Sequence, residues 1–221
     1  MLAKAFEKYV YSENVTIFAS GVSNSNETDD TVFLREENLL KEHIRSKNHL
    51  VYFSSCDAIY ATKINKKYYY HKLRMEELIR VESDCFNVFR IPQIIGPTGN
   101  KMSLISFFIN KIRSHESFEI WGNAKKNLIH VNDVVNIVSY IIDNGLEPNS
   151  IQNIGNSNYY SLQELIECLE NILNLKGDFQ ILNKGFIPDY DLSFSNAIAK
   201  KVNLDFHSHY LYDSLKEIIY I

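Results

Sequence analysis

The sequence is poor in the residue types that identify several common classes of protein. It has three cysteines, four prolines and one tryptophan in 221 residues. The cysteines are odd in number and lack metal-type spacing, so reduced thiols are the simplest interpretation. No apolar run approaches the roughly 20 residues of a membrane helix, and the first ten residues lack the apolar segment of a secretory signal. We therefore expect a cytoplasmic protein with no membrane partner.

The sequence also has no excess of positive charge. The formal net charge is −4, from 23 Lys and Arg against 27 Asp and Glu, so there is no broad basic surface for nucleic acid. Asp205, His207 and His209 alternate near the C-terminus and would share one face of a strand. Because such spacing is common by chance, we interpret it as a polar face and predict no metal site.

Helical and strand patterns alternate along the first part of the chain. Helical patterns cover residues 1–10, 31–46, 67–80 and 130–145. Strand patterns cover residues 15–19, 49–55 and 86–95. The strand at 49–55 is apolar enough to be buried on both faces. This order predicts an α/β fold with a parallel sheet flanked by helices.

The pattern changes after residue 96. We expect helices over 101–114, 161–175 and 211–221, and short strands at 117–122 and 151–156. Ser161 and Glu164 stand at capping-box spacing. This half predicts a smaller lobe attached to the sheet.

Three tyrosines open the helical segment at 67–80, and the first stands four residues before a lysine. Tyr68 and Lys72 would therefore share one face of the helix. A free phenol has a pKa of about 10, and a nearby ammonium lowers that pKa toward the range of a proton shuttle. On this pair alone, packing tyrosines and a solvated lysine are the favoured interpretation, because Tyr-x-x-x-Lys often arises by chance.

Five segments in a fixed order reverse that preference. They are VYFSSCDAIY, YYYHKLRMEELI, FNVFRIPQIIGP, NLIHVNDVVNIVSYII and IQNIGNSNYYSLQELIECL. Their order resembles the extended short-chain dehydrogenase/reductase superfamily, and within it the NAD-dependent sugar-nucleotide epimerase/dehydratase family. The resemblance implies a Rossmann-like sheet domain (1–95 plus 128–155) and a smaller C-terminal substrate-binding lobe (96–127 plus 156–221). It also implies NAD or NADP as cofactor, a nucleotide sugar as substrate, and a homodimer.

The resemblance also assigns catalytic roles. Tyr68 becomes the general acid and base, and Lys72 lowers its pKa and bonds the nicotinamide ribose. The family's third catalytic group is a Ser or Thr hydroxyl, and that position falls on Cys56. Since a thiol is a weak donor, Ser55 is the alternative.

Further contacts follow from the same resemblance. Ser20 and Gly21 match the strand end that passes under the cofactor, and Pro92 matches the strand end beside the nicotinamide. Gln93 and Lys126 match substrate-binding positions. Lys126 stands where the family often has an arginine for the nucleotide diphosphate, and it offers a point charge in place of a bidentate fork.

Two acidic positions refine the expected chemistry. The dehydratase members carry an Asp-Glu pair, and the matching residues here are Asp57 and Ala58. The missing glutamate favours an epimerase or a reductase. Asp133 is expected to cap or brace its helix.

No glycine precedes Gly21, although a dinucleotide fold joins its first strand to its first helix through a glycine-rich turn. MLAKAFEKYV resembles that first helix already under way. We therefore expect the first strand and its turn upstream of Met1, weak or no NAD binding by the sequence as it stands, and an exposed sheet edge beside 15–19.

Two functions remain open. One is an NAD(P)-dependent sugar-nucleotide epimerase or reductase of surface polysaccharide precursor synthesis. The other is a catalytically silent Rossmann-like remnant that binds a sugar nucleotide or a partner protein, which Cys56 and the missing turn favour.

Overall fold

The computed structural model describes residues 1–97 and 103–219, and its larger sheet contains four parallel strands in the order β1-β2-β3-β7. These strands are β1 (Val15–Phe18), β2 (His49–Ser55), β3 (Phe86–Ile91) and β7 (Ser150–Asn153). The predicted parallel α/β sheet is confirmed. β2 lies between two neighbours and is buried on both faces, as its continuous apolar run predicts.

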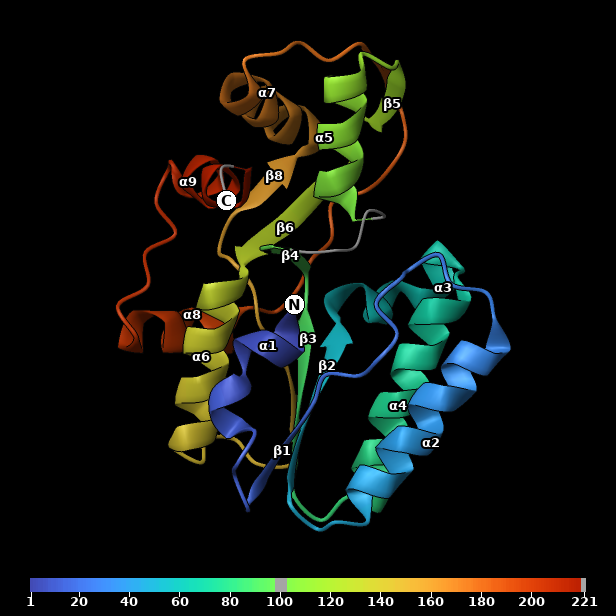
Figure 1. Cartoon of the computed structure of the whole chain (residues 1–221), viewed down its shortest axis with the longest axis vertical. Coiled ribbons are helices and arrows are strands. Elements are labelled where there is room, and N and C mark those ends of the chain that lie inside the picture. Colours follow the sequence, from blue (N-terminus) through green and yellow to red (C-terminus); the bar gives the residue numbers. More distant parts are fainter. Residues whose placement is uncertain (98–102, 220–221) are drawn as a thin grey trace.

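Helices cover both faces of this sheet (Figure 1). One face packs against α2 (Asp30–Ile44) and α4 (Lys67–Glu82). The other packs against α1 (Leu2–Ala5), α6 (Val131–Asp143) and α8 (Ser193–Lys201). Side chains alternate along β2, so that Leu50 and Tyr52 join the first core and Val51 and Phe53 the second.

A smaller lobe lies beyond the carboxyl ends of the large sheet, at the top of Figure 1. Its helices are α5 (Leu104–Ser114), α7 (Leu162–Leu173) and α9 (Tyr210–Ile219). Its strands form the sheets β4-β6-β8 and β5-β9, namely β4 (Gln93–Ile95), β5 (Phe118–Trp121), β6 (Lys125–His130), β8 (Tyr159–Ser161) and β9 (Phe179–Leu182).

Local signals explain several element ends. Ser161 and Glu164 form the expected capping box at the start of α7, with Glu164 N donating to Ser161 Oγ at 3.1 Å. Gly145 follows α6 with a φ of +60°, which is the left-handed conformation that its position predicts. Asp133 braces α6, because its Oδ2 accepts a hydrogen bond from the Tyr210 hydroxyl of α9 at 2.5 Å.

The structure also corrects the expected element bounds. The helix over 1–10 is two short pieces, α1 and the 3-10 turn η1 (Glu7–Tyr9). The strand over 86–95 is broken at Pro92 into β3 and β4, which belong to different sheets, because proline cannot donate to a strand ladder. Residues 101–102 and 220–221 of two expected helices lie outside the described residues.

Two further differences concern the C-terminal half. α8 was not expected, and it packs on α6 and β7 rather than in the lobe, so the segment 193–206 belongs with the large sheet. Asp205, His207 and His209 lie in a turn region and not on a strand. The wider division into two domains remains a prediction.

β1 forms one edge of the large sheet. Among the described residues it pairs with β2 alone, and three of its four residues are half-buried. The edge expected beside residues 15–19 is therefore present.

Candidate active site

Tyr68 and Lys72 lie on the inner face of α4, near the carboxyl ends of β1 and β2. The i, i+4 spacing places both toward the core, and their exposed fractions are 9% and 2%. The Tyr68 hydroxyl makes no hydrogen bond with a described residue, so its donor and acceptor positions are unused there.

The Lys72 ammonium is directed to two neighbours other than Tyr68. Lys72 Nζ donates to Glu36 Oε1 at 2.9 Å and to the Tyr52 hydroxyl at 3.0 Å. It lies 5.7 Å from the centre of the Tyr68 ring. The lysine is thus paired with a carboxylate while it flanks the tyrosine.

Glu36 is the residue that sequence reasoning missed. It lies in the middle of α2, is fully buried, and accepts a hydrogen bond on Oε2 from Val22 N at 2.6 Å and another on Oε1 from the Tyr52 hydroxyl at 2.6 Å. His71 Nε2 lies 3.0 Å from Oε2. Glu36 falls between Phe33 and Leu40 on the apolar stripe of α2, and a carboxylate on such a stripe is the signal that could have found it.

This surrounding raises the pKa of Tyr68, contrary to the expectation that Lys72 lowers it. Burial is the main cause, and electrostatic interactions with Tyr69, Glu36 and Asp57 raise the pKa of Tyr68 further. Burial also lowers the pKa of Lys72, against the attraction of Glu36. The carboxylate removes the net positive field that the simple Tyr-Lys pair would provide.

The candidate third group is a buried thiol. Cys56 opens the 3-10 turn η2 (Cys56–Tyr60), and its Sγ donates to the carbonyl oxygen of Arg90 at 3.1 Å. Burial, followed by the charge of Asp57, raises the pKa of this thiol. The alternation along β2 places Ser55 on the face of Val51 and Phe53, opposite α4, and its hydroxyl makes no hydrogen bond with a described residue.

A segment from the lobe closes over η2. The Tyr190 hydroxyl donates to Asp57 Oδ1 at 2.5 Å, and the Tyr60 hydroxyl bonds both the N–H and the carbonyl of Asp189. Leu192 and Tyr190 pack on Cys56. The thiol therefore lies under aromatic side chains.

An ion pair beneath the site ties α4 to β3. Arg90 donates to Glu76 through Nε at 2.9 Å and Nη2 at 2.5 Å, and Ser54 Oγ donates to Glu76 Oε1 at 2.6 Å. This bidentate pair fixes α4, and with it Tyr68 and Lys72, against the sheet.

A family model described as the NAD dependent epimerase/dehydratase family matches residues 2–155. The chain belongs to this family. The match includes β1 to β3, α4 and β7, which carry the tyrosine, the lysine and their supports. A search of curated proteins gave no match.

Solved structures share the fold of this epimerase/dehydratase chain at low sequence identity. The PbgP3 protein of Burkholderia pseudomallei has a TM-score of 0.73 and 18% identity, with 99% of this chain and 80% of that chain covered. UDP-glucose 4-epimerase of Thermus thermophilus, in complex with NAD, has a TM-score of 0.74 and 12% identity, with 99% and 82% covered. WbmH of Bordetella bronchiseptica, in complex with NAD⁺, has a TM-score of 0.75 and 11% identity, with 97% and 77% covered.

Of the residues expected to contact the family's cofactor, Ser20 and Gly21 follow β1, and Pro92 lies between β3 and β4. Gly21 lies against the buried pair, since a Cβ there would be 2.7 Å from Glu36 Oε1 and 2.9 Å from Lys72 Nζ. Ser20 accepts a hydrogen bond from Arg35 Nη2 through its carbonyl at 3.2 Å. Pro92 is half-buried between β3 and β4.

The expected substrate residues of the family lie toward the lobe. Gln93 pairs with Leu128, two residues after Lys126, so Gln93 and Lys126 are on the same face of their sheet. Both are half-buried, and no ion pair with a described residue involves Lys126. No hydrogen bond among the described residues joins either of them to Tyr68.

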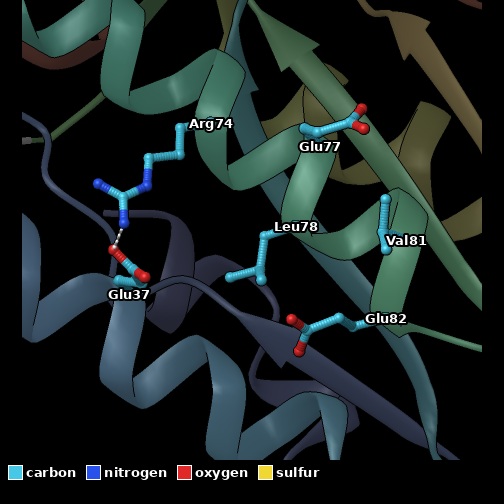
Figure 2. A pocket seen from close by; sticks show the side chains of 6 residues that line it. All are labelled: Glu37, Arg74, Glu77, Leu78, Val81 and Glu82. Carbon is cyan, nitrogen blue, oxygen red and sulfur yellow. Dashed lines mark ion pairs between the residues drawn. The ribbon is translucent and has the colours of Figure 1, made fainter.

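Two cavities are described, and neither is lined by the family's tyrosine or lysine. The larger, with a volume of about 300 Å³, lies between α2 and α4 and is lined by Glu37, Arg74, Glu77, Leu78, Val81 and Glu82. Figure 2 shows the Glu37–Arg74 ion pair at its edge. The other lies near β4 and α5, among Ile94, Gly96, Ser103 and Ile218.

Within residues 1–97 and 103–219, no cluster of three or more His, Cys, Asp or Glu side chains could hold a metal ion. No helix in this part of the chain has both the length and the apolar composition needed to cross a bilayer.

Proposed function

We propose that the chain is an NAD(P)-dependent sugar-nucleotide epimerase or reductase of surface polysaccharide precursor synthesis, acting in the cytoplasm. The observation that supports this most is the placement of Tyr68 and Lys72 on the inner face of α4, beside the carboxyl ends of β1 and β2. Ligands of open α/β sheets bind outside the carboxyl ends of the strands.

The residues present fit a bound nicotinamide ribose in part. An ammonium carries three N–H donors, and Lys72 uses two of them on described residues, which leaves one for a ribose hydroxyl. Only a residue without a Cβ lets the backbone at Gly21 pass this close to the ammonium, since a Cβ there would lie 2.9 Å from Lys72 Nζ. When bound, the cofactor supplies the chemistry of hydride acceptance or donation.

The chain's own part in this reaction is proton transfer and binding. Tyr68 exchanges its proton with the oxygen of the reacting sugar carbon. Cys56 holds the position of the third catalytic group, and its thiol, a weak donor, would have to leave the Arg90 carbonyl to reach the sugar. Gln93 and Lys126 contact the nucleotide sugar, with the lysine near its diphosphate, and Ser20 and Pro92 border the cofactor.

Turnover of nucleotide sugars tests this function. Protein incubated with NAD⁺ or NADP⁺, or their reduced forms, and a panel of NDP-sugars is expected to change a sugar or the cofactor. Tyr68→Phe should lower the rate by about 10² to 10⁴-fold, the usual contribution of a general acid or base. Tyr70→Phe is the matched control, because Tyr70 lies on the same helix and is 43% exposed. Equal rates for wild type and Tyr68→Phe would contradict the proposal.

A second function is favoured by the Glu36–Lys72 pair. An ammonium already held by a buried carboxylate is less available to a cofactor, and this arrangement suits a catalytically silent protein that binds a sugar nucleotide or a partner. Calorimetric binding of an NDP-sugar without turnover by any cofactor would support this alternative.

We also propose that the protein is a homodimer. Light scattering coupled to size-exclusion chromatography tests it directly, and a mass near 25.7 kDa would identify a monomer.

A further inference from the structure

The buried Glu36 has no role in the proton transfer described above, yet it organises the residues that perform it. Its two oxygens meet four donors from three parts of the chain: Val22 after β1, Tyr52 on β2, and His71 and Lys72 on α4. A helix that only needed to pack would carry an apolar residue here, since an isolated buried carboxylate is costly.

The position of Gly21 shows how closely the pair is built into the fold. A Cβ at this residue would lie within 3 Å of both Glu36 Oε1 and Lys72 Nζ. The backbone after β1 therefore passes directly against the carboxylate and the ammonium, and both are held in one place.

The Glu36–Lys72 pair affects Tyr68 through its electrostatic field. The groups that face it are Glu36 from α2, Asp57 from η2, Tyr52 from β2, and Tyr69 and Lys72 from its own helix. The single positive group among them is Lys72, and that ammonium bonds Glu36 at 2.9 Å. Coulomb attraction at this distance in a buried site is strong, so the pair acts on Tyr68 as a nearly neutral unit.

We propose that Glu36 is a positioning residue that fixes Lys72 and cancels its charge, so that Tyr68 carries its proton at neutral pH and serves as a proton donor to a keto-sugar. This proposal on Glu36 rests on the proposed function, and of its two reactions it favours reduction over epimerisation. An epimerase must also remove a hydroxyl proton, which a neutral phenol does poorly.

The proton step balances on named groups. The Tyr68 O–H bond breaks, an O–H bond forms on the former carbonyl oxygen of the sugar, and the phenolate regains a proton from water. The hydride that completes the reduction is the chemistry that a bound reduced nicotinamide supplies.

Titration of the tyrosines in the protein without cofactor or sugar tests the inference. Protein labelled with ¹³C at the tyrosine Cζ is followed by NMR as the pH rises, and Tyr68→Phe identifies the Tyr68 signal. Wild-type Tyr68 should remain un-ionised at pH 10. In Glu36→Gln, which keeps the shape but not the charge, its apparent pKa should fall by at least one pH unit.

Glu37→Gln is the matched control. Glu37 is the next residue on α2, but it pairs with Lys41 and Arg74 on the outer side, so its loss should leave the Tyr68 titration unchanged. Ionisation of wild-type Tyr68 below pH 10, or a Glu36→Gln titration no lower than wild type, would overturn the inference. If Glu36→Gln does not fold, ionisation of wild-type Tyr68 below pH 10 still overturns the inference. Because no cofactor or sugar is present, these outcomes are separate from absence of turnover.

Discussion

At the scale of single residues, the site depends on one buried carboxylate. Burial acts to raise the pKa of Glu36, but hydrogen bonding from His71, the charge of Lys72, and the bonds from Tyr52 and Val22 together lower it from 4.5 to about 2. The folded state therefore holds this proton less tightly than the unfolded state does.

The lowered pKa of Glu36 predicts an acid-sensitive contribution to stability. The difference between 4.5 and about 2 is equivalent to about 3 kcal/mol of unfolding free energy. Since the folded pKa is the lower one, this contribution is fully present above about pH 4.5 and is lost as the pH falls toward 2. Denaturant unfolding at several pH values should show a steeper acid loss for wild type than for Glu36→Gln. Glu119→Gln serves as the control, because Glu119 is exposed on β5. Parallel curves for wild type and Glu36→Gln would refute the prediction.

The space at Gly21 gives a second prediction at this scale. Gly21→Ala places a methyl group against two buried, hydrogen-bonded atoms, so we expect a loss of about 1–3 kcal/mol in unfolding free energy. Gly145→Asn is the control, because its φ of +60° tolerates asparagine and nothing lies within 4 Å. A Gly21→Ala variant as stable as wild type would contradict the prediction, because Glu36 and Lys72 would then move to make room for the methyl group at little cost. The measurement is urea denaturation.

At the scale of elements, the strands and helices around the site followed from short-range patterns. The runs at 15–19 and 49–55 are rich in β-branched and aromatic residues, and both became strands of the large sheet. β6 was missed because its first residues, Lys125 to Asn127, are polar, and its pairing with β4 and β8 is a tertiary contact. α8 was missed for a similar reason, as it gains its stability by packing on α6 and β7.

Residue spacing likewise predicted only part of the site. Tyr68 and Lys72 share a helix face because four residues span about one helical turn. The partner of the lysine could not be read from spacing, since Glu36 stands on another helix, 36 positions away. Charge on an apolar stripe indicates a buried partner but does not name it.

The attachment of α4 to the sheet predicts a contrast between adjacent carboxylates. Glu76 and Glu77 each form a bidentate pair with an arginine, Arg90 and Arg80 respectively, but Glu76 is buried and Glu77 exposed. Glu76→Gln leaves Arg90 without its counter-charge and should cost about 3 kcal/mol. Glu77→Gln should have no measurable effect, because solvent screens an exposed pair. Equal melting temperatures for the two variants would contradict this reasoning.

At the scale of the whole molecule, the lobe and the large sheet meet over the candidate site. Between β9 in the lobe and α8 on the sheet, the chain packs on η2, where Phe186 contacts Tyr60, and Tyr190 and Leu192 contact Cys56. This crossing segment, residues 186–192, places Tyr190 on Asp57 and Cys56, so the environment of the candidate thiol depends on how firmly the two parts are joined.

Removal of the Tyr190 hydroxyl tests how much the crossing segment stabilises the junction of the lobe and the large sheet. Tyr190→Phe keeps the ring packed on Cys56 and Leu192 but removes the 2.5 Å hydrogen bond to Asp57, which should cost about 1–3 kcal/mol because a charged acceptor loses its donor. For a chain of this size, the melting temperature should fall by about 2–4 °C per kcal/mol. Tyr11→Phe is the matched control, since Tyr11 is 94% exposed. Trypsin should also cleave Tyr190→Phe faster at the exposed Lys184, just before the crossing segment. Unchanged melting and cleavage would mean that the aromatic packing alone joins the lobe to the sheet.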